Sequence, residues 1–267
     1  MVAKETRTSI LTRRLSQRFR RYRLVRSAAY RLGMALATKQ RVLVGQLASG
    51  SPIVLTSGDP AHRQIFFYGT YEEHVTAVFR SRVKPNDTVV DVGANAGYFA
   101  LLSRDLGADV HAFEPNPAMA SLIRRSLELR GGGVKVVEQA CSGREGIFPL
   151  YLAESTNMAT GSLNAEASGA RSIDVSATTL DAYVRRTGIA PTLVKVDIER
   201  HEADFVQGAV DTLASIRPDL VVEMTDVEAL AALLSMGYRA SRITPGGLIP
   251  TTDLGPDGWA NMLLTAA

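Results

Sequence analysis

Short runs of apolar residues alternate with longer segments in which apolar residues recur every three or four positions, through most of the chain after residue 85. The short runs are typical of buried strands, and the longer segments have the period of amphipathic helices. The core strands predicted in this way, each separated from the next by a predicted helix, are Thr88–Asp91, Val110–Phe113, Val134–Gln139, Thr192–Asp197 and Leu220–Glu223. This alternation indicates a doubly wound α/β sheet that is mostly parallel. Two late runs, Tyr238–Ile243 and Asn261–Thr265, fit its antiparallel edge, with a Gly- and Pro-rich turn region at Pro245–Gly258 between them.

Other segments add detail to this pattern. Ahead of the sheet, Ile65–Tyr68 has a β-type pattern, and Thr70 can cap a helix that reaches about Arg82. The helix before the fifth core strand is expected to continue from Phe205 to Leu213. Residues 145–180 contain two expected strands around a polar stretch rich in small residues. Because variable loops on a fixed scaffold often carry specificity, this insertion is expected to cover the substrate.

Residues 1–45 form a basic arm that differs from the body of the chain. Apolar residues recur at helical spacing between arginines, which predicts a basic amphipathic helix beginning near Thr8 or Ser9. The apolar positions are Leu11, Leu15, Phe19, Tyr22 and Val25. Such a stripe can pack on the body or on a second subunit of an oligomer, contact an anionic membrane surface or acidic partner, or belong to a targeting peptide. Residues 46–267 are expected to form a single α/β domain.

Charge is distributed unevenly between the arm and the body. The arm holds 12 of the 30 Lys and Arg residues and one of the 27 acidic residues, so the net charge of +3 conceals an acidic body. Nucleic-acid binding is therefore not expected of the body. The single cysteine, Cys141, excludes an intramolecular disulfide and fits a cytoplasmic location, with the arm as a means of peripheral membrane contact. No apolar run reaches the roughly 18 residues that a membrane-spanning helix needs.

The strand that ends at Asp91 leads into a loop, Gly93–Gly97, and then into the apolar start of a helix. This arrangement lets a nucleotide-like ligand approach bare backbone at the carboxyl end of a parallel strand. Glu114, at the tip of the next strand, is placed to accept hydrogen bonds from ribose hydroxyls. The loop lacks the dinucleotide pattern G-x-G-x-x-G, since Asn95 replaces the second glycine, and it contains no basic residue. S-adenosylmethionine, which has ribose and adenine but no phosphate, fits better than a nicotinamide cofactor or a purely structural turn.

Acidic residues end most of the expected parallel strands. Ligands bind outside the carboxyl ends of such strands, where four acids are expected to meet: Asp91, Glu114, Asp197 and Glu223. Four carboxylates around one crevice suit a cationic ligand such as a sulfonium and would repel a phosphate. The tip of the third strand should contact the adenine through residues 139–142, which include Ala140 and Cys141. Cys141 is expected to be a small packing residue rather than a nucleophile.

Methyl transfer is a direct displacement, so the enzyme must align the acceptor atom and often remove its proton. The fourth strand and its tip supply the candidate catalytic residues Lys195, Asp197 and His201. His201 or Asp197 is the expected base, because this tip faces the methyl group in such an architecture. Alternatively, His201 is an exposed residue at the start of the next helix, and Lys195 is the buried partner of a strand-tip acid. No metal site is expected, although the carboxylates beside His201 could hold a divalent ion that orients a hydroxyl pair.

Several motifs, in order along residues 65–225, resemble the FkbM-type methyltransferase family. They are Val90–Gly97, Ala112–Pro115, Thr179–Asp181, Val194–Glu199 and Arg217–Glu223, with Gly69–Glu72 and Gly208-Ala209. The resemblance implies a class I methyltransferase (Rossmann-like) fold that uses S-adenosylmethionine, usually for O-methylation of a sugar, glycan or natural-product hydroxyl. It implies cofactor contacts at Asp91, Gly93, Asn95, Gly97 and Glu114, to which the strand tips add Pro115, Ala140, Cys141 and Asp197.

The chain departs from the family pattern at two positions. Arg200 stands where the family commonly has a glycine, and Gly143 replaces an acid. If the first position requires a positive φ, arginine is costly there. Two other functions stay open: a nucleic-acid or protein methyltransferase, which the basic arm supports, and a non-catalytic interaction protein, which Arg200 supports. No Asn-Pro-Pro-Tyr-type tetrapeptide for base flipping is present.

Overall fold

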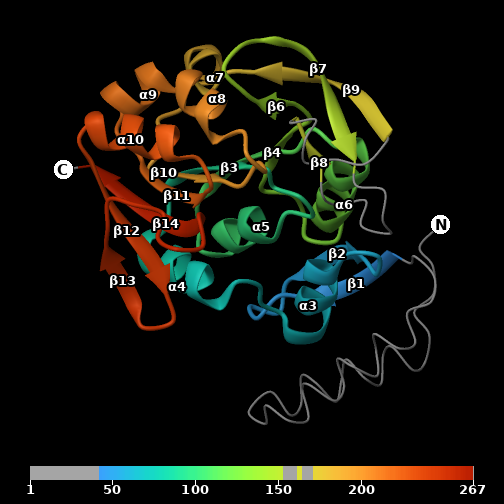
Figure 1. Ribbon diagram of the computed structural model, residues 1–267. Helices are drawn as coiled ribbons and strands as arrows, with labels where there is room; N and C mark the ends of the chain where they lie inside the picture. Colours follow the sequence, from blue (N-terminus) through green and yellow to red (C-terminus); the bar gives the residue numbers. More distant parts are fainter. Residues whose placement is uncertain (1–41, 153–160, 164–170, 267) are drawn as a thin grey trace.

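The computed structural model describes residues 42–152, 161–163 and 171–266, so the predicted helix of the basic arm lies outside the described residues. In this part of the chain an eight-stranded sheet forms the centre, in the order β13-β12-β14-β11-β10-β3-β4-β5 (Figure 1). The parallel strands are β3 (Thr88–Val92), β4 (Asp109–Phe113), β5 (Lys135–Val137), β10 (Leu193–Val196) and β11 (Asp219–Met224). The far edge consists of β12 (Tyr238–Thr244), β13 (Gly247–Pro250) and β14 (Ala260–Ala266), and β14 runs antiparallel to β11.

Helices cover both faces of this sheet. Val89 and Val90 of β3 belong to the hydrophobic cores on opposite faces, because successive side chains of a strand point to opposite sides. The Val89 face is covered by α4 (Glu73–Arg82), α5 (Tyr98–Asp105) and α6 (Pro117–Glu128). The Val90 face is covered by α7 (Leu180–Thr187), α8 (Glu202–Gln207), α9 (Val210–Ser215) and α10 (Val227–Ser235). The predicted doubly wound sheet with an antiparallel edge is confirmed.

None of the described helices combines the length and the apolar composition needed to cross a lipid bilayer.

The sheet grows in two directions from β3. Strands β4 and β5 extend it on one side, and the chain then returns to add β10 and β11 on the other. A reversal of this kind opens a crevice at the carboxyl ends of the central strands, which is where α/β sheets bind ligands. The strand-tip residues singled out in the sequence therefore meet at one place.

A small unit precedes the sheet, made of the hairpin β1 (Val42–Gln46) and β2 (Pro52–Thr56) and the helix α3 (Pro60–Tyr68). The β-type interpretation of Ile65–Tyr68 is wrong, because these residues form the end of α3. Asp59 caps the helix by accepting a hydrogen bond from the His62 amide, and Gly69 ends it in the left-handed conformation. These caps outweigh the β propensity of the aromatic run, whose side chains the helix buries against the hairpin.

Close backbone approaches explain two further differences from the sequence patterns. The expected helix Phe205–Leu213 is divided into α8 and α9 near Gly208, where a Cβ atom would collide with the Ser142 carbonyl oxygen. The expected turn region Pro245–Gly258 contains a short strand, β13, paired with β12. The division near Gly208 depends on Ser142, which is distant in sequence, and β13 depends on its pairing with β12 at the edge of the sheet. The periodicity of a segment encodes neither of these partners.

The insertion folds as a separate sheet within the described residues, in the order β6-β9-β7-β8. Its strands are β6 (Ala140–Cys141), β7 (Gly146–Leu152), β8 (Gly161–Ser162) and β9 (Arg171–Thr178). The two predicted strands of the insertion correspond to β7 and β9. Figure 1 shows this sheet on the opposite side of α6 from the hairpin.

A buried ion pair joins the hairpin to the sheet domain. Arg130, whose side chain is 2% exposed, forms a salt bridge with Asp105 at the end of α5. Asp105 also accepts hydrogen bonds from Ser49 and Ser51 in the hairpin turn, at 2.5 and 3.0 Å. Removing one member of a buried ion pair leaves the other without compensation.

Replacement of Arg130 by Met is therefore expected to lower the free energy of unfolding by about 3 kcal/mol. Arg124→Met is the control, because its ion pair with Glu138 is exposed and should contribute less than about 1 kcal/mol. Urea denaturation of both variants measures the difference. Equal, small losses would contradict the assigned role of Arg130.

Candidate active site

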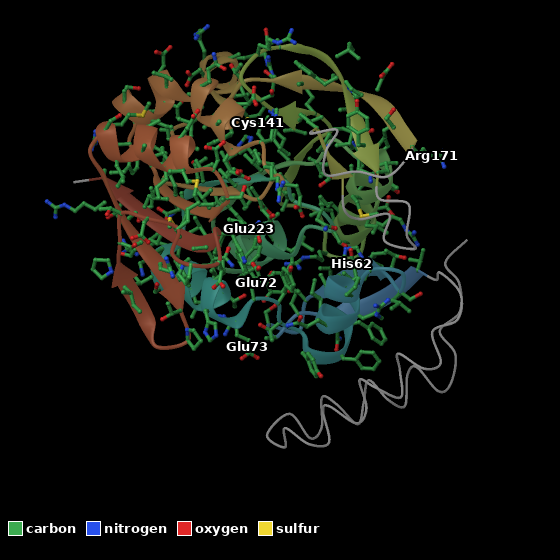
Figure 2. The ribbon with its side chains drawn as sticks, in the orientation of Figure 1. His62, Glu72, Glu73, Cys141, Arg171 and Glu223 are labelled. Atoms are coloured by element: carbon green, nitrogen blue, oxygen red, sulfur yellow. The ribbon has the colours of Figure 1, made fainter. Side chains whose placement is uncertain are left out.

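The crevice at the strand reversal contains a cavity of about 470 Å³. It is bounded by the carboxyl ends of β3, β4, β10 and β11, by the start of α3 and by the insertion sheet. Acidic side chains predominate among its polar lining residues, which include Asp59, Glu72, Glu114, Asp197, Glu199 and Glu223. Figure 2 shows Glu72 and Glu223 close to the centre of the molecule, with His62 toward the α3 side. The predicted site residues Gly93, Asn95, Pro115, Ala140, Cys141 and His201 line the same cavity.

The glycine loop is held in place by its backbone. Gly93, Asn95 and Gly97 all have positive φ angles, of 79°, 54° and 85°. A Cβ atom on Gly93 would collide with the carbonyl oxygen of Asp197, so this glycine lets the loop pack directly on the end of β10. The amides of Gly93 and Ala94 donate to the carbonyl oxygen of Phe113 at 3.0 and 2.9 Å. The loop is thus fastened to the ends of both neighbouring strands.

Glu114 lies at the tip of β4 and is buried. Its Oε2 accepts a hydrogen bond from the Asn95 amide at 2.7 Å, and its Oε1 accepts one from the Asn116 amide at 2.8 Å. Burial raises the pKa of Glu114 to about 8, although these two amides act in the opposite direction. Each carboxylate oxygen has a second lone pair that can accept from a ligand hydroxyl.

Asp91 is buried at the end of β3, and neither of its carboxylate oxygens has a hydrogen-bond partner of good geometry among the described residues. Burial raises its pKa to about 6, while the Lys195 ammonium and the Ala100 amide lower it. Buried polar atoms without a partner are rare in folded proteins. Among the predicted site residues, however, Asp91, Gly97 and Lys195 are not part of the cavity lining, so the nearest charge to act on Asp91 is the buried Lys195 ammonium.

Lys195 is the buried cation of this acidic cluster. Its Nζ donates to Asp197 Oδ2 at 2.9 Å and lies 4.9 Å from the centre of the Phe99 ring. Burial opposes its charge, yet Asp197 and Asp91 raise the pKa of Lys195 well above the ordinary value. The geometry therefore shows that Lys195 is the buried partner of a strand-tip acid.

Asp197 and Glu223 are neighbouring carboxyl groups that differ in their protonation. Burial works against ionisation of Asp197, but Lys195 and a hydrogen bond with Glu223 hold the pKa of Asp197 below its ordinary value. Burial, and then repulsion from Asp197, raise the pKa of Glu223 to about 9. Asp197 is thus the ionised member of the pair, and Glu223 is the protonated one that donates to it.

His201 precedes α8, and both of its ring nitrogens face protein groups. Nε2 lies 2.9 Å from Ser142 Oγ, and Nδ1 lies 3.3 Å from Asp204 Oδ2. Burial lowers the pKa of His201, so the imidazole is neutral at pH 7. The side chain is not the exposed residue of the alternative interpretation, since it is only 13% exposed.

Cys141 is buried in the core, one position before the Ser142 that contacts His201. Burial raises the pKa of its thiol, which disfavours the thiolate form. Its environment is that of a packing residue.

Glu72 lies in the cavity, beyond the helix cap that the sequence pattern assigned to Thr70. The helix α4 begins after Glu72, not after Thr70, and Glu72 makes no side-chain capping hydrogen bond. Burial raises the pKa of Glu72, whereas the Lys195 ammonium and the Asn261 side chain act in the opposite direction. The backbone of Glu72 has a positive φ of 40°. The family-like motif around Glu72 was the available signal.

Arg200 has a φ of 66°, in the left-handed region where glycine is favoured. A side chain with a Cβ atom costs about 1 kcal/mol or more in this conformation. Arg200→Gly is therefore expected to increase the free energy of unfolding by about 1 kcal/mol. Arg200→Ala is the control, because it removes the charge and keeps the strained Cβ. Chemical denaturation should find the alanine variant no more stable than the wild type; equal stabilisation by both changes would rule out backbone strain as the cause.

In the described ranges, no group of three or more His, Cys, Asp or Glu side chains is arranged so that it could hold a metal ion.

The strand order, with an antiparallel strand beside β11, and the crevice at β3 define a class I methyltransferase fold. The model of the FkbM methyltransferase domain matches residues 91–240, more than half of the chain. The chain therefore belongs to the FkbM methyltransferase family.

Two characterised relatives of this family are similar to the chain. The hexuronic acid methyltransferase AglP of Haloferax volcanii is 27% identical over 177 residues, which cover 65% of this chain and 72% of AglP. The 31-O-demethyl-FK506 methyltransferase FkbM of Streptomyces tacrolimicus is 26% identical over 216 residues, covering 66% of this chain and 80% of that enzyme. Among solved structures, a methyltransferase FkbM from Methylobacillus flagellatus aligns with a TM-score of 0.46 and 14% identity; the match covers 76% of this chain and about half (52%) of the other.

Proposed function

We propose that this protein is an S-adenosylmethionine-dependent methyltransferase that transfers a methyl group to a hydroxyl of a sugar, glycan or natural product. The observation that carries the proposal is the cavity of a methyltransferase-family chain lined by carboxylates and by no Lys or Arg among the described residues. Such a cavity favours a cation and disfavours the pyrophosphate of a dinucleotide.

The residues present fit this cofactor, which supplies an electrophilic methyl group when bound. Glu114 lines the cavity and can accept from the cofactor's ribose hydroxyls, and the buried Asp91 carboxylate at the end of β3 adds negative charge that favours a cation. Gly93 lines the cavity, whereas Gly97 allows the loop to pack closely on Ile123. Ala140 and Cys141 offer a small apolar surface for adenine, with Pro115 beside the ribose and Asp197 at the opposite end.

For catalysis we assign the base to His201 and a supporting function to Asp197 and Lys195. A neutral imidazole can accept the acceptor's proton, and Asp204 at Nδ1 would stabilise the imidazolium that forms. Because Nε2 is occupied by the buried Ser142, this function requires the His201 ring to turn toward the cavity that it lines. Asp197 is a weaker base because Lys195 and Glu223 already donate to it, and Lys195, being ionised, has no lone pair to offer.

The charge of the cavity also supports a neutral acceptor. Glu72 and Glu199 also line the cavity, and their carboxylates would repel an acceptor carboxylate. A neutral hydroxyl needs a base to become a nucleophile, and His201 supplies one. A carboxylate acceptor would need none; AglP is named for a hexuronic acid, which carries both hydroxyls and a carboxylate.

The test is transfer of a radiolabelled methyl group from S-adenosylmethionine to matched acceptors: a neutral hexoside, its uronate, a macrolide polyol, tRNA and a peptide. An alkali-stable label on the hexoside or the polyol is expected, because methyl ethers resist alkali and methyl esters do not. An alkali-labile label on the uronate would overturn hydroxyl methylation. Label on tRNA or peptide would favour the alternative methyltransferase classes, and failure to bind the cofactor would favour a non-catalytic protein.

The raised carboxyl pKa values predict how cofactor affinity changes with pH. Near pH 7 Glu114 and Glu223 are largely protonated in the ligand-free protein, since their pKa values are about 8 and about 9. A bound sulfonium favours the ionised forms, so its binding releases protons and tightens as pH rises. S-adenosylhomocysteine lacks this charge but shares the rest of the structure.

The preference for S-adenosylmethionine over S-adenosylhomocysteine is therefore expected to increase severalfold between about pH 6.5 and about pH 8.5. Calorimetric Kd values for both ligands at the two pH values measure it. Glu223→Gln, which removes one titrating group, should flatten the dependence. A preference that is the same at both pH values would contradict the assignment of these carboxyls to the cation.

A further inference from the structure

His62 connects the small N-terminal unit to the glycine loop. It lies in α3, is 1% exposed, and belongs to a part of the chain that precedes the family-matched residues 91–240. The Thr56 amide of β2 donates to its Nδ1 at 3.2 Å. Its Nε2 lies 2.8 Å from Oδ1 of Asn95. Figure 2 places His62 at the junction between α3 and the sheet domain.

The Thr56 contact determines the state of the ring. A backbone amide can only donate, so Nδ1 must carry a lone pair and no proton. A neutral imidazole then carries its proton on Nε2, and burial, which lowers the pKa of His62, keeps it neutral. Nε2 is therefore a donor, and the Asn95 atom that faces it must be the amide oxygen.

Asn95 is consequently held from two sides. Its backbone, with a φ of 54°, donates its amide hydrogen to Glu114, and its side-chain oxygen accepts from His62. The side-chain Nδ2 makes no hydrogen bond to another described residue, and Asn95 lines the cavity. The fixed amide oxygen thus leaves the NH₂ group as a donor to a ligand.

This donor has a specific use in an acidic cavity. The methionine part of the proposed cofactor carries a carboxylate, which the surrounding Asp and Glu side chains would repel. An oriented NH₂ group satisfies that carboxylate without placing a cation beside the sulfonium. Resting on the proposed function, we propose that His62 is a positioning residue that fixes the Asn95 amide so that it donates to the carboxylate of the cofactor.

The experiment compares two probes by calorimetry: S-adenosylhomocysteine, which has the amino-acid group, and 5′-methylthioadenosine, which lacks it. Asn95→Gly removes the amide and keeps a residue that tolerates the left-handed backbone. We expect it to weaken S-adenosylhomocysteine binding about tenfold or more and to leave 5′-methylthioadenosine binding unchanged. His62→Leu should reproduce this pattern. His62→Gln, whose amide nitrogen can replace Nε2 as a donor, should restore part of the affinity.

The double variant His62→Leu/Asn95→Gly separates positioning from a general structural effect. If His62 acts through Asn95, the double variant binds S-adenosylhomocysteine no more weakly than Asn95→Gly alone. Additive losses, or equal losses for both probes in His62→Leu, would overturn the proposal while leaving the methyltransferase proposal intact. Absence of binding of either probe to the wild-type protein would instead overturn the cofactor assignment, and this proposal with it.

Discussion

A Glu114→Gln variant is expected to bind S-adenosylhomocysteine at least about 100-fold more weakly than the wild-type protein. The substitution keeps the size of the side chain but removes the ionised form that the bound cofactor favours, and hydrogen bonds to a charged acceptor are the stronger ones. It also leaves one of the two backbone amides that Glu114 now accepts, from Asn95 or Asn116, without an acceptor. The variant should therefore lose both its affinity for the ligand and one of the hydrogen bonds that hold the backbone around Glu114 in place.

The measurement is a thermal-shift titration, confirmed by calorimetry, with S-adenosylmethionine, S-adenosylhomocysteine and NAD. A ligand that binds only the folded protein raises its melting temperature as the ligand concentration exceeds Kd. Glu128→Gln, an exposed change on α6, is the matched control and should respond like the wild type. If S-adenosylmethionine and S-adenosylhomocysteine stabilise Glu114→Gln as much as the wild type, the assigned function of Glu114 is contradicted. Stabilisation by NAD alone would contradict the choice of cofactor.

Gly93→Ala is expected to cost about 3 kcal/mol or more of the free energy of unfolding. Two separate effects add in this variant: an alanine in the left-handed region is strained, and its Cβ would collide with the Asp197 carbonyl oxygen. Because that oxygen belongs to the backbone that follows β10, it cannot move without disturbing the carboxyl end of the central sheet. Cofactor binding is expected to be lost in the fraction that still folds.

The chain contains a matched control for this prediction. Gly131 has almost the same φ, 78° against 79° for Gly93, but no atom lies within 4 Å of the position of its Cβ. Gly131→Ala should therefore cost only the backbone term, about 1 kcal/mol. Urea denaturation measures the loss in the free energy of unfolding for each alanine variant, and the difference between the two losses is the cost of the collision. Similar losses of unfolding free energy in both variants would mean that the loop at Gly93 shifts to accommodate a Cβ atom without further cost.

Much of the central architecture was predictable because it is encoded locally. The core strands are short apolar runs with turn residues at their ends, and the caps of α6 and α10 are Asn116 and Asp226, which stand directly before their helices. Since parallel strands end at a common edge, the acids at those ends could be assigned to one crevice before any distance was known. The roles of individual residues within the crevice remain proposals.

Other features were not predictable because they depend on partners distant in sequence. Ile65–Tyr68 has a strand-like pattern by itself, but its capping residues and the hairpin surface make it a helix. Glu72 could serve as a cap or as a cavity residue until its position opposite Lys195 and Asn261 was known. Nothing in the sequence indicates that His62 contacts Asn95, 33 positions later.

The sequence by itself determined the class of the protein. The doubly wound sheet, the glycine loop without the dinucleotide-binding pattern and the acidic strand tips are each encoded within a few neighbouring residues. The tertiary structure decided the protonation and the orientation of the groups at the site. Asp197 is ionised and Glu223 is protonated because burial and Lys195 act on them differently, and the Asn95 amide is oriented because Thr56 dictates which nitrogen of His62 carries the proton. Local pattern specifies which residues reach the crevice, whereas burial and long-range hydrogen bonds specify their chemical state there.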